Sequence, residues 1–129
     1  MKQAVMYGGG NIGRGFIGAL LSQSGYEVTF IDVAEPVVNA LREKHEYPVR
    51  YVSSAGHEDV IIRNVTAVNG NDAEAASEAI ANCDIMATAV GARILKFIIG
   101  NIVAGLRKRW ARTDKPLNII ICENLMDAN

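Results

Sequence analysis

Apolar residues follow two different periods in turn along this chain. Short apolar runs indicate buried strands. Between these runs, apolar residues recur every three or four positions, which places them on one face of an α-helix. The alternation predicts a parallel sheet with helices on both faces. The expected strands are 2–7, 27–32, 65–68, 84–90 and 117–122, and the expected helices are 11–24, 34–44, 72–82 and 93–109.

Residues typical of helix ends agree with these bounds. Pro36 falls in the first turn of the second expected helix, where the missing amide hydrogen leaves no bond unmade. Asn71 or Asp72 is suited to cap the third helix, and Gly25 is suited to end the first.

Residues 48–68 depart from the alternation. Two β-type runs, 49–52 and 60–62, stand on either side of the turn 53–56, which predicts an inserted β-hairpin. The fold class is therefore predicted as α/β, a Rossmann-type doubly wound fold with a mainly parallel sheet and an inserted hairpin. About five parallel strands are counted, whereas a dinucleotide-binding sheet commonly has six. We expect the protein to be truncated here, before a further domain.

Composition narrows the class of partner. The chain has 129 residues, of which 21% are charged, and its formal net charge is -1. Such a charge creates no positive electrostatic field that would attract nucleic acid or an anionic membrane. Cys83 and Cys122 lie inside apolar runs, which favours buried thiols in a reducing compartment over a disulfide. No apolar stretch approaches the roughly 20 residues that span a bilayer, and no signal-peptide pattern is present. We expect a cytoplasmic protein with a small-molecule partner.

The pattern Gly8-x-Gly10-x-x-Gly13 follows the first expected strand and opens the first expected helix. In dinucleotide-binding folds the first glycine permits a tight turn and the second lets the backbone approach a pyrophosphate. The third lets the helix pack closely on the strand. The amides of Asn11, Ile12 and Gly13 would then face the phosphates. Taken alone, the pattern also fits a plain structural turn.

Asp32 strengthens the dinucleotide interpretation. It ends the second expected strand, 19 residues after Gly13. A carboxylate at that place accepts hydrogen bonds from the adenosine ribose, and its charge repels a 2′-phosphate. The next residue is Val33, not an arginine that would bind such a phosphate. These features favour NAD over NADP as cofactor, and the alternative is a surface aspartate that caps the following helix.

Two further loops are predicted at the carboxyl edge of the sheet, where doubly wound folds bind ligands. Ala89, Val90 and Gly91 close the fourth expected strand, and their backbone is suited to line the pyrophosphate and ribose. Glu123 and Asn124 follow the fifth strand and would face the nicotinamide. The alternatives are a simple strand-to-helix turn for the first loop and helix capping for the second.

The remaining charged residues carry weaker signals. Arg14 would contact a phosphate of cofactor or substrate, or lie solvated on its helix. His45 and His57 have no partner at metal-ligand spacing, so we expect surface residues and no metal site. A basic cluster near the end of the last helix is interpreted as a solvated helix end that the macrodipole favours. Its members are Arg107, Lys108, Arg109, Arg112 and Lys115.

Four separated segments are distinctive: GGGNIGRGFIG (8–18), FID (30–32), CDIMATAVG (83–91) and LNIIICEN (117–124). Together they resemble the long-chain polyol and mannitol dehydrogenases, in particular the mannitol-1-phosphate 5-dehydrogenase branch. The resemblance covers the whole chain in order. One departure is Gly9, where the family usually has alanine, and a glycine there does not block a phosphate. The early start of the first strand favours the sugar-phosphate branch over the mannitol 2-dehydrogenases and hexuronate reductases.

The resemblance implies reversible, metal-independent hydride transfer between NAD and D-mannitol 1-phosphate, which gives D-fructose 6-phosphate. In that family the general base is a lysine, assisted by asparagine and histidine, in a largely helical carboxyl-terminal domain. No catalytic residue can therefore be assigned within 1–129. We expect an NAD-binding Rossmann domain that is inactive alone and meets its sugar-phosphate substrate only in a full-length protein.

Other classes remain as alternatives. A regulatory NAD-sensing Rossmann module would have a complete six-stranded sheet and a dimer surface, and the inserted hairpin argues against it. A methyltransferase can share the glycine-rich first turn and the acidic end of the second strand, but the full glycine pattern favours a dinucleotide. A hexuronate or mannitol dehydrogenase of the same family is a further alternative.

Overall fold

The computed structural model describes residues 2–10, 13–91 and 94–123. Its elements, in chain order, are β1 (Lys2–Tyr7), the π-helix η1 (Gly13–Ile17), α1 (Gly18–Gln23), β2 (Tyr26–Asp32), α2 (Glu35–Lys44), β3 (Glu46–Ser53), β4 (Gly56–Arg63), β5 (Val65–Asn69), α3 (Ala73–Asn82), β6 (Ile85–Thr88), α4 (Leu95–Arg112) and β7 (Asn118–Ile121). Five strands form one sheet in the order β5-β2-β1-β6-β7, and all neighbouring pairs are parallel. The chain winds outward from β1 first to one side and then to the other, as in doubly wound folds. The predicted Rossmann-type sheet is confirmed.

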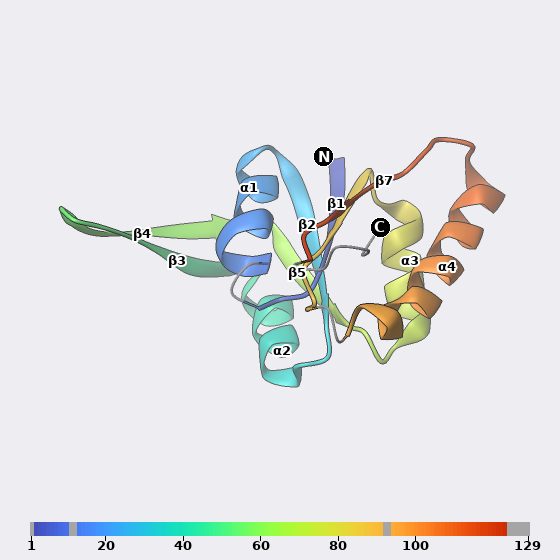
Figure 1. Ribbon diagram of the computed structural model, residues 1–129, viewed down its shortest axis with the longest axis horizontal. Coiled ribbons are helices and arrows are strands. Elements are labelled where there is room, and N and C mark those ends of the chain that lie inside the picture. The colour runs from blue at the N-terminus through green and yellow to red at the C-terminus, as the bar shows by residue number, and fades with distance from the viewer. Residues whose placement is uncertain (1, 11–12, 92–93, 124–129) are drawn as a thin grey trace.

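Helices cover both faces of the sheet, with α1 and α2 on one side and α3 and α4 on the other (Figure 1). The central strand shows why two cores form. Ala4 and Met6 belong to the core beneath α1 and α2, whereas Val5 and Tyr7 belong to the core beneath α3 and α4. Successive side chains of a strand point to opposite faces, so a continuous apolar run is buried on both sides.

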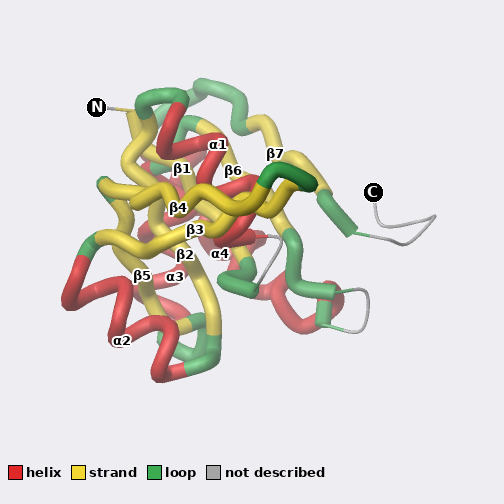
Figure 2. Tube along the Cα trace, turned by 90° about the vertical axis from the view of Figure 1, so that its left-hand side faces the viewer, coloured by secondary structure: helices red, strands yellow, loops and turns green. Residues whose placement is uncertain are grey.

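The predicted hairpin is formed by β3 and β4, which pair as a separate antiparallel sheet. It extends away from the body in Figure 1 and lies in front of the parallel sheet in Figure 2. The base of the hairpin packs on the core beneath α1 and α2 through Tyr47, Val49 and Ile62. The ring of Tyr47 meets the ring of Phe30 edge-on, with 5.7 Å between the centroids. These contacts fix the hairpin beside the helix that follows the glycine turn.

The helix predicted at 11–24 differs in detail, because it begins with η1 and becomes α-helical only at Gly18. Glycines at 13, 15 and 18 weaken the local preference for regular α-helix, which makes a wide π turn easier to form. A side chain at Gly18 would collide with the ring of Phe30, so this helix packs directly against β2. Gly25 has φ +95° and follows the last turn, as its predicted helix-ending role requires.

The strand predicted at 84–90 is also shorter, because β6 ends at Thr88. The amide of Ala89 still donates to the carbonyl of Tyr7, at 2.9 Å. The next two amides donate to a side chain, and Gly91 turns the chain at φ +93°. The last helix extends three residues beyond the predicted end at 109. No helix in the described ranges is long and apolar enough to cross a membrane.

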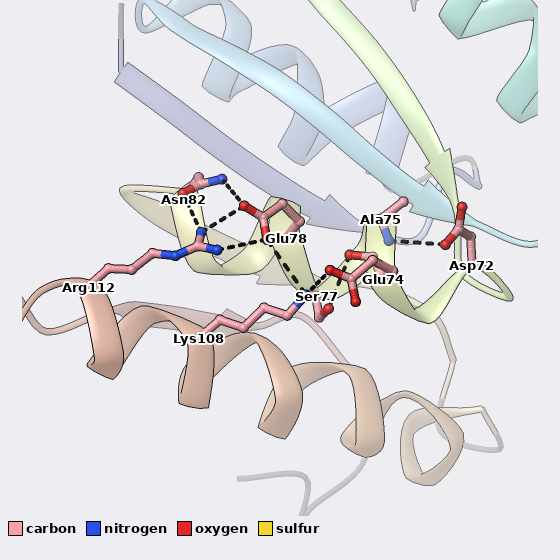
Figure 3. Close-up of polar contacts among 8 residues, drawn as sticks. All are labelled: Asp72, Glu74, Ala75, Ser77, Glu78, Asn82, Lys108 and Arg112. Atoms are coloured by element: carbon pink, nitrogen blue, oxygen red, sulfur yellow. Dashed lines mark hydrogen bonds and ion pairs between the residues drawn. The ribbon is translucent and has the colours of Figure 1, made fainter.

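Ion pairs join α3 to α4 (Figure 3). The Lys108 Nζ atom lies 2.6 Å from Glu74 Oε1, and Arg112 Nη1 lies 2.7 Å from Glu78 Oε1. The hydrogen bonds from Arg112, together with one from Asn82, hold the pKa of Glu78 down at about 2. Much of the basic cluster is therefore paired with α3, not simply solvated.

Arg109 corrects the sequence interpretation further, because its side chain is buried and only 5% of the residue is exposed. The guanidinium presents five donors in a fixed plane, which suits several acceptors at once. This residue ties the end of α4 to the α3–β6 turn and to the segment that leads into β7. It donates to four backbone carbonyl oxygens, those of Ala81, Cys83, Lys115 and Pro116.

Candidate functional site

The glycine turn lies at the carboxyl end of the central strand. Gly8 has φ +112°, and a side chain there would collide with the carbonyl oxygen of Ala89. A side chain at Gly13 would collide with the carbonyl oxygen of Gly8. These two glycines are therefore required by the fold itself. Gly10 differs, because an added Cβ would meet nothing within 4 Å. That open space is what close approach of a ligand to the backbone requires.

Asp32 is bound to the glycine turn. Its Oδ2 atom accepts from the amide of Gly9 at 2.6 Å, and its Oδ1 atom accepts from the amide of Ala34 at 3.0 Å. The first bond joins the end of β2 to the turn after β1, and the second forms the bend into α2. The carboxylate therefore has a structural role at the start of the following helix, as in the alternative interpretation of Asp32 as a helix cap. Among the described residues each oxygen accepts one bond, which leaves a second lone pair for a ligand.

A cleft of about 340 Å³ opens at this edge of the sheet, within the range typical of small-molecule sites. It runs between the turn after β2, the loop after β5 and the first turns of α4. Most of its lining is apolar, with polar groups at a few points. The lining residues are Tyr7, Gly8, Gly10, Ile31, Asp32, Val33, Gly70, Asn71, Ala89, Val90, Ile94, Phe97, Ile98 and Asn101.

The loop after β6 is held by a carboxylate from the end of β7. Glu123 accepts from the amide of Val90 at 3.0 Å and from the amide of Gly91 at 2.9 Å. Those two amides are therefore occupied by Glu123. The predicted contact of this loop's backbone with the pyrophosphate and ribose stays a prediction. Ala89 and Val90 line the cleft, and Gly91 is not among its lining residues.

An asparagine of α4 links three elements beneath the cleft. The Asn101 Nδ2 atom donates to Tyr7 Oη and to the carbonyl oxygen of Gly70, both at 2.9 Å. Burial raises the pKa of the Tyr7 phenol above its usual value, and the bond from Asn101 partly offsets that rise. Sequence reasoning missed this cluster. Its one signal was a lone amide at position 101, between Ile98 and Ile102 in an otherwise apolar stripe.

Arg14 lies apart from the cleft. It lines a second depression of about 310 Å³ between η1 and the base of the hairpin. Its carbonyl oxygen accepts from Tyr47 Oη at 2.6 Å, which fixes its backbone. The Arg14 Nε atom is buried and has no hydrogen-bond partner among residues 2–10, 13–91 and 94–123. The structure therefore does not bring this residue together with Asp32.

The other sequence expectations divide into two groups. His45 and His57 are exposed, and no group of three metal-ligating side chains occurs in the part of the chain that the structure describes. Three predicted cofactor residues, Asn11, Ile12 and Asn124, lie outside the described residues.

Comparisons with known proteins agree with the geometry. The family described as the mannitol dehydrogenase Rossmann domain matches residues 2–129. A mannitol-1-phosphate 5-dehydrogenase of Brevibacillus brevis is 46% identical over 95% of this chain and 32% of its own length. One of Shouchella clausii is 48% identical over 98% of this chain and 33% of its own length. The chain thus spans about a third of the length of these relatives.

Solved structures with low sequence identity share the fold. An octopine dehydrogenase with NADH and L-arginine superposes with a TM-score of 0.62 at 20% identity, over 79% of this chain and 25% of that one. A saccharopine dehydrogenase of Saccharomyces cerevisiae gives 0.55 at 14% identity, over 99% of this chain and 23% of that one. These likenesses confirm the Rossmann fold alone. The family match over residues 2–129 goes further: the chain belongs to the mannitol dehydrogenase family of oxidoreductases and forms the Rossmann domain of that family.

Proposed function

We propose that this chain binds NAD(H) in the cleft at the carboxyl edge of its sheet. One observation carries the proposal: the turn with open space at Gly10 is bound through Gly9 to the carboxylate of Asp32, at 2.6 Å. A phosphate-approach point and a ribose acceptor are thereby held side by side. This pair is what a dinucleotide requires of the first two strands of a Rossmann fold.

The residues fit the cofactor group by group. The pyrophosphate lies against Gly10 and the neighbouring amides, for which Asn11, Ile12 and Gly13 are the proposed donors. Asp32 accepts from the ribose hydroxyls with its remaining lone pairs. Val33 offers no positive charge to a 2′-phosphate, so the proposal is NAD rather than NADP. NAD, when bound, supplies the acceptor for a hydride.

Three further parts of the chain are proposed to contact the cofactor: the loop after β6, the end of β7 and Arg14. The backbone of Ala89, Val90 and Gly91 is proposed to line the pyrophosphate and ribose, in a loop whose shape is set by Glu123. Asn124 is proposed to reach the cofactor from the end of β7. Arg14, whose buried Nε atom has no hydrogen-bond partner among the described residues, is proposed to contact a phosphate of cofactor or substrate.

The reaction follows from the relatives. Several similar proteins are named mannitol-1-phosphate 5-dehydrogenase, each about three times as long as the region that this chain matches. We propose that the parent protein interconverts D-mannitol 1-phosphate and D-fructose 6-phosphate. The cleft supplies the cofactor half of that site. The substrate base and pocket belong to the length that the relatives have in addition, so the 129-residue chain is expected to bind NADH without turnover.

Binding is tested by titrating the chain with NADH and NADPH and following nicotinamide fluorescence or heat. NADH should bind at least about tenfold more tightly, equivalent to 1.4 kcal/mol. Gly10→Val should abolish binding while the fold survives, because its side chain fills the open space at the turn. Equal affinities for both cofactors, or undiminished binding by Gly10→Val, would contradict the proposal.

Turnover is tested separately, by NADH formation from mannitol 1-phosphate and NADH consumption with fructose 6-phosphate. The full-length Brevibacillus brevis relative is the positive control. Loss of positioned acid-base catalysis and substrate orientation removes many powers of ten in rate. Turnover by the 129-residue chain comparable to that of the relative would refute the assignment of catalysis to the additional length.

A further inference from the structure

The cleft is lined by a hydrogen-bonded pair of polar side chains together with apolar residues. Tyr7, 4% exposed, and Asn101 both line the cleft. Around them lie Ile31, Ile98 and the other apolar lining residues. Buried polar groups in an apolar pocket are the groups that fix the orientation and identity of a ligand. The pair therefore has a capacity for recognition beyond its role in joining α4 to β1.

The direction of the Asn101 amide is fixed by its neighbours. The carbonyl oxygen of Gly70 can only accept, so the side-chain atom 2.9 Å from it must be Nδ2. Both hydrogens of Nδ2 are then used, one for Gly70 and one for Tyr7. The Oδ1 atom of Asn101 forms no hydrogen bond within the ranges that the structure describes, and it remains an acceptor.

Tyr7 supplies the complementary group. Its hydroxyl oxygen accepts from Asn101, so the hydroxyl hydrogen is free to donate elsewhere. Burial raises the pKa of this phenol, which keeps it protonated and a donor at neutral pH. A Cβ added at Gly70 would lie in van der Waals contact with Tyr7 Oη, at 3.5 Å, so the glycine leaves that one position beside the hydroxyl unfilled. An acceptor and a donor are thus placed side by side.

We propose that Asn101 and Tyr7 read the base of the dinucleotide and select adenine. The Asn101 Oδ1 atom accepts from the exocyclic amino group, and the Tyr7 hydroxyl donates to a neighbouring ring nitrogen. Apolar residues such as Val33 and Phe97 enclose the ring. This inference rests on the proposed binding of NAD(H) and adds a specificity determinant to it.

The chemistry predicts which analogue is rejected. Hypoxanthine has almost the shape of adenine but carries a carbonyl oxygen in place of the amino group. That oxygen would face the Asn101 carbonyl, so two acceptors would meet without a hydrogen between them. A site built to bond a polar group discriminates strongly against an analogue that leaves its own group unpaired. Reduced nicotinamide hypoxanthine dinucleotide should therefore bind roughly ten- to a hundredfold more weakly than NADH.

The experiment measures dissociation constants of NADH and reduced nicotinamide hypoxanthine dinucleotide for the chain and three variants. Asn101→Leu should remove the preference between the two, bringing them within about twofold. Tyr7→Phe, which keeps the ring packing, should weaken NADH binding roughly three- to tenfold. Tyr26→Phe is the matched control, because Tyr26 pairs with Lys2 at the opposite end of the sheet, and its affinities should not change. Thermal melting confirms that each variant is folded.

The outcomes separate the two proposals. Tight NADH binding with a preference that Asn101→Leu abolishes supports base reading by the pair. Tight NADH binding with equal affinity for the hypoxanthine analogue overturns this inference and leaves the proposed function standing. A preference that survives in both Asn101→Leu and Tyr7→Phe also overturns it. Absence of NADH binding by the unmodified chain overturns both.

Discussion

Replacing Asp32 by alanine tests the centre of the proposed site. The substitution removes two acceptors, one 2.6 Å from the Gly9 amide and one 3.0 Å from the Ala34 amide. It also removes the charge that would meet the ribose hydroxyls and repel a 2′-phosphate. Two effects are therefore expected together, a loss of stability and a loss of cofactor affinity.

The two effects have different sizes. A hydrogen bond to a charged group contributes roughly 1.5–3 kcal/mol to stability, and less when it is exposed to solvent. One of the two amide bonds is part-buried and the other is exposed, so we expect a total stability loss of about 2 kcal/mol. Loss of the ribose contact should weaken NADH binding roughly ten- to a hundredfold. NADPH binding should change much less, because it has no such contact to lose.

A matched control separates affinity from stability. The Asp84 Oδ2 atom accepts from the amide of Gln3 at 2.7 Å, at the amino ends of β1 and β6. Asp84→Ala therefore removes a similar bond at the edge of the sheet away from the cleft. Urea unfolding and NADH titration are measured for both variants. If Asp32→Ala and Asp84→Ala retained the same NADH affinity, the assignment of Asp32 to the ribose would be refuted.

Three further predictions follow from the contacts. The hydrogen bonds from Arg112 lower the pKa of Glu78 from 4.5 to about 2. Glu78→Gln should therefore have a lower melting temperature than the unmodified chain at pH 7. The difference between the two melting temperatures should shrink as the pH falls toward 2.5. An unchanging difference would contradict the ion-pair assignment. Burial raises the pKa of the Cys83 thiol to about 11. Iodoacetamide at pH 8 should therefore label half-buried Cys122 at least roughly tenfold faster than Cys83. Peptide mass spectrometry measures both labelling rates, and equal rates would count against this prediction. Gly13→Ala should cost about 1–3 kcal/mol in urea unfolding through its contact with the turn, and an unchanged midpoint would argue against that contact.

The strands and most helix bounds could be predicted because they depend on local periodicity. β1 was predicted to the residue, and the hairpin was recognisable as two β-type runs around a glycine-containing turn. Asp72 caps α3 with a bond to the amide of Ala75, as one of the two residues considered for that cap. Each of these features is determined by residues close together in the sequence, so a reader of the sequence has all the partners in view.

The features that could not be predicted depend on partners far along the chain. Arg109 looked like a solvated helix end, yet its acceptors include a carbonyl 28 residues away. Asn101 reaches across 94 residues to Tyr7. The role of Glu123 depends on amides more than 30 residues earlier. The type of each residue restricted its chemistry, but only the packing of α4 and β7 on the sheet decides which groups it meets.

The two loops that flank the cleft are held in the same way, each by a carboxylate from a neighbouring strand end. Asp32 holds the glycine turn through Gly9, and Glu123 holds the loop after β6 through Val90 and Gly91. Because these bonds exist before any ligand arrives, binding does not have to order the residues that they hold, Gly9, Val90 and Gly91. The entropy cost of ordering these residues is therefore not subtracted from the affinity. Both carboxylates belong to strand ends at the carboxyl edge of the sheet, but only Asp32 lines the cleft. Replacing Asp32 removes both the ribose acceptor and the charge that repels a 2′-phosphate, so the preference for NADH over NADPH should be largely lost in Asp32→Ala and retained in Asp84→Ala.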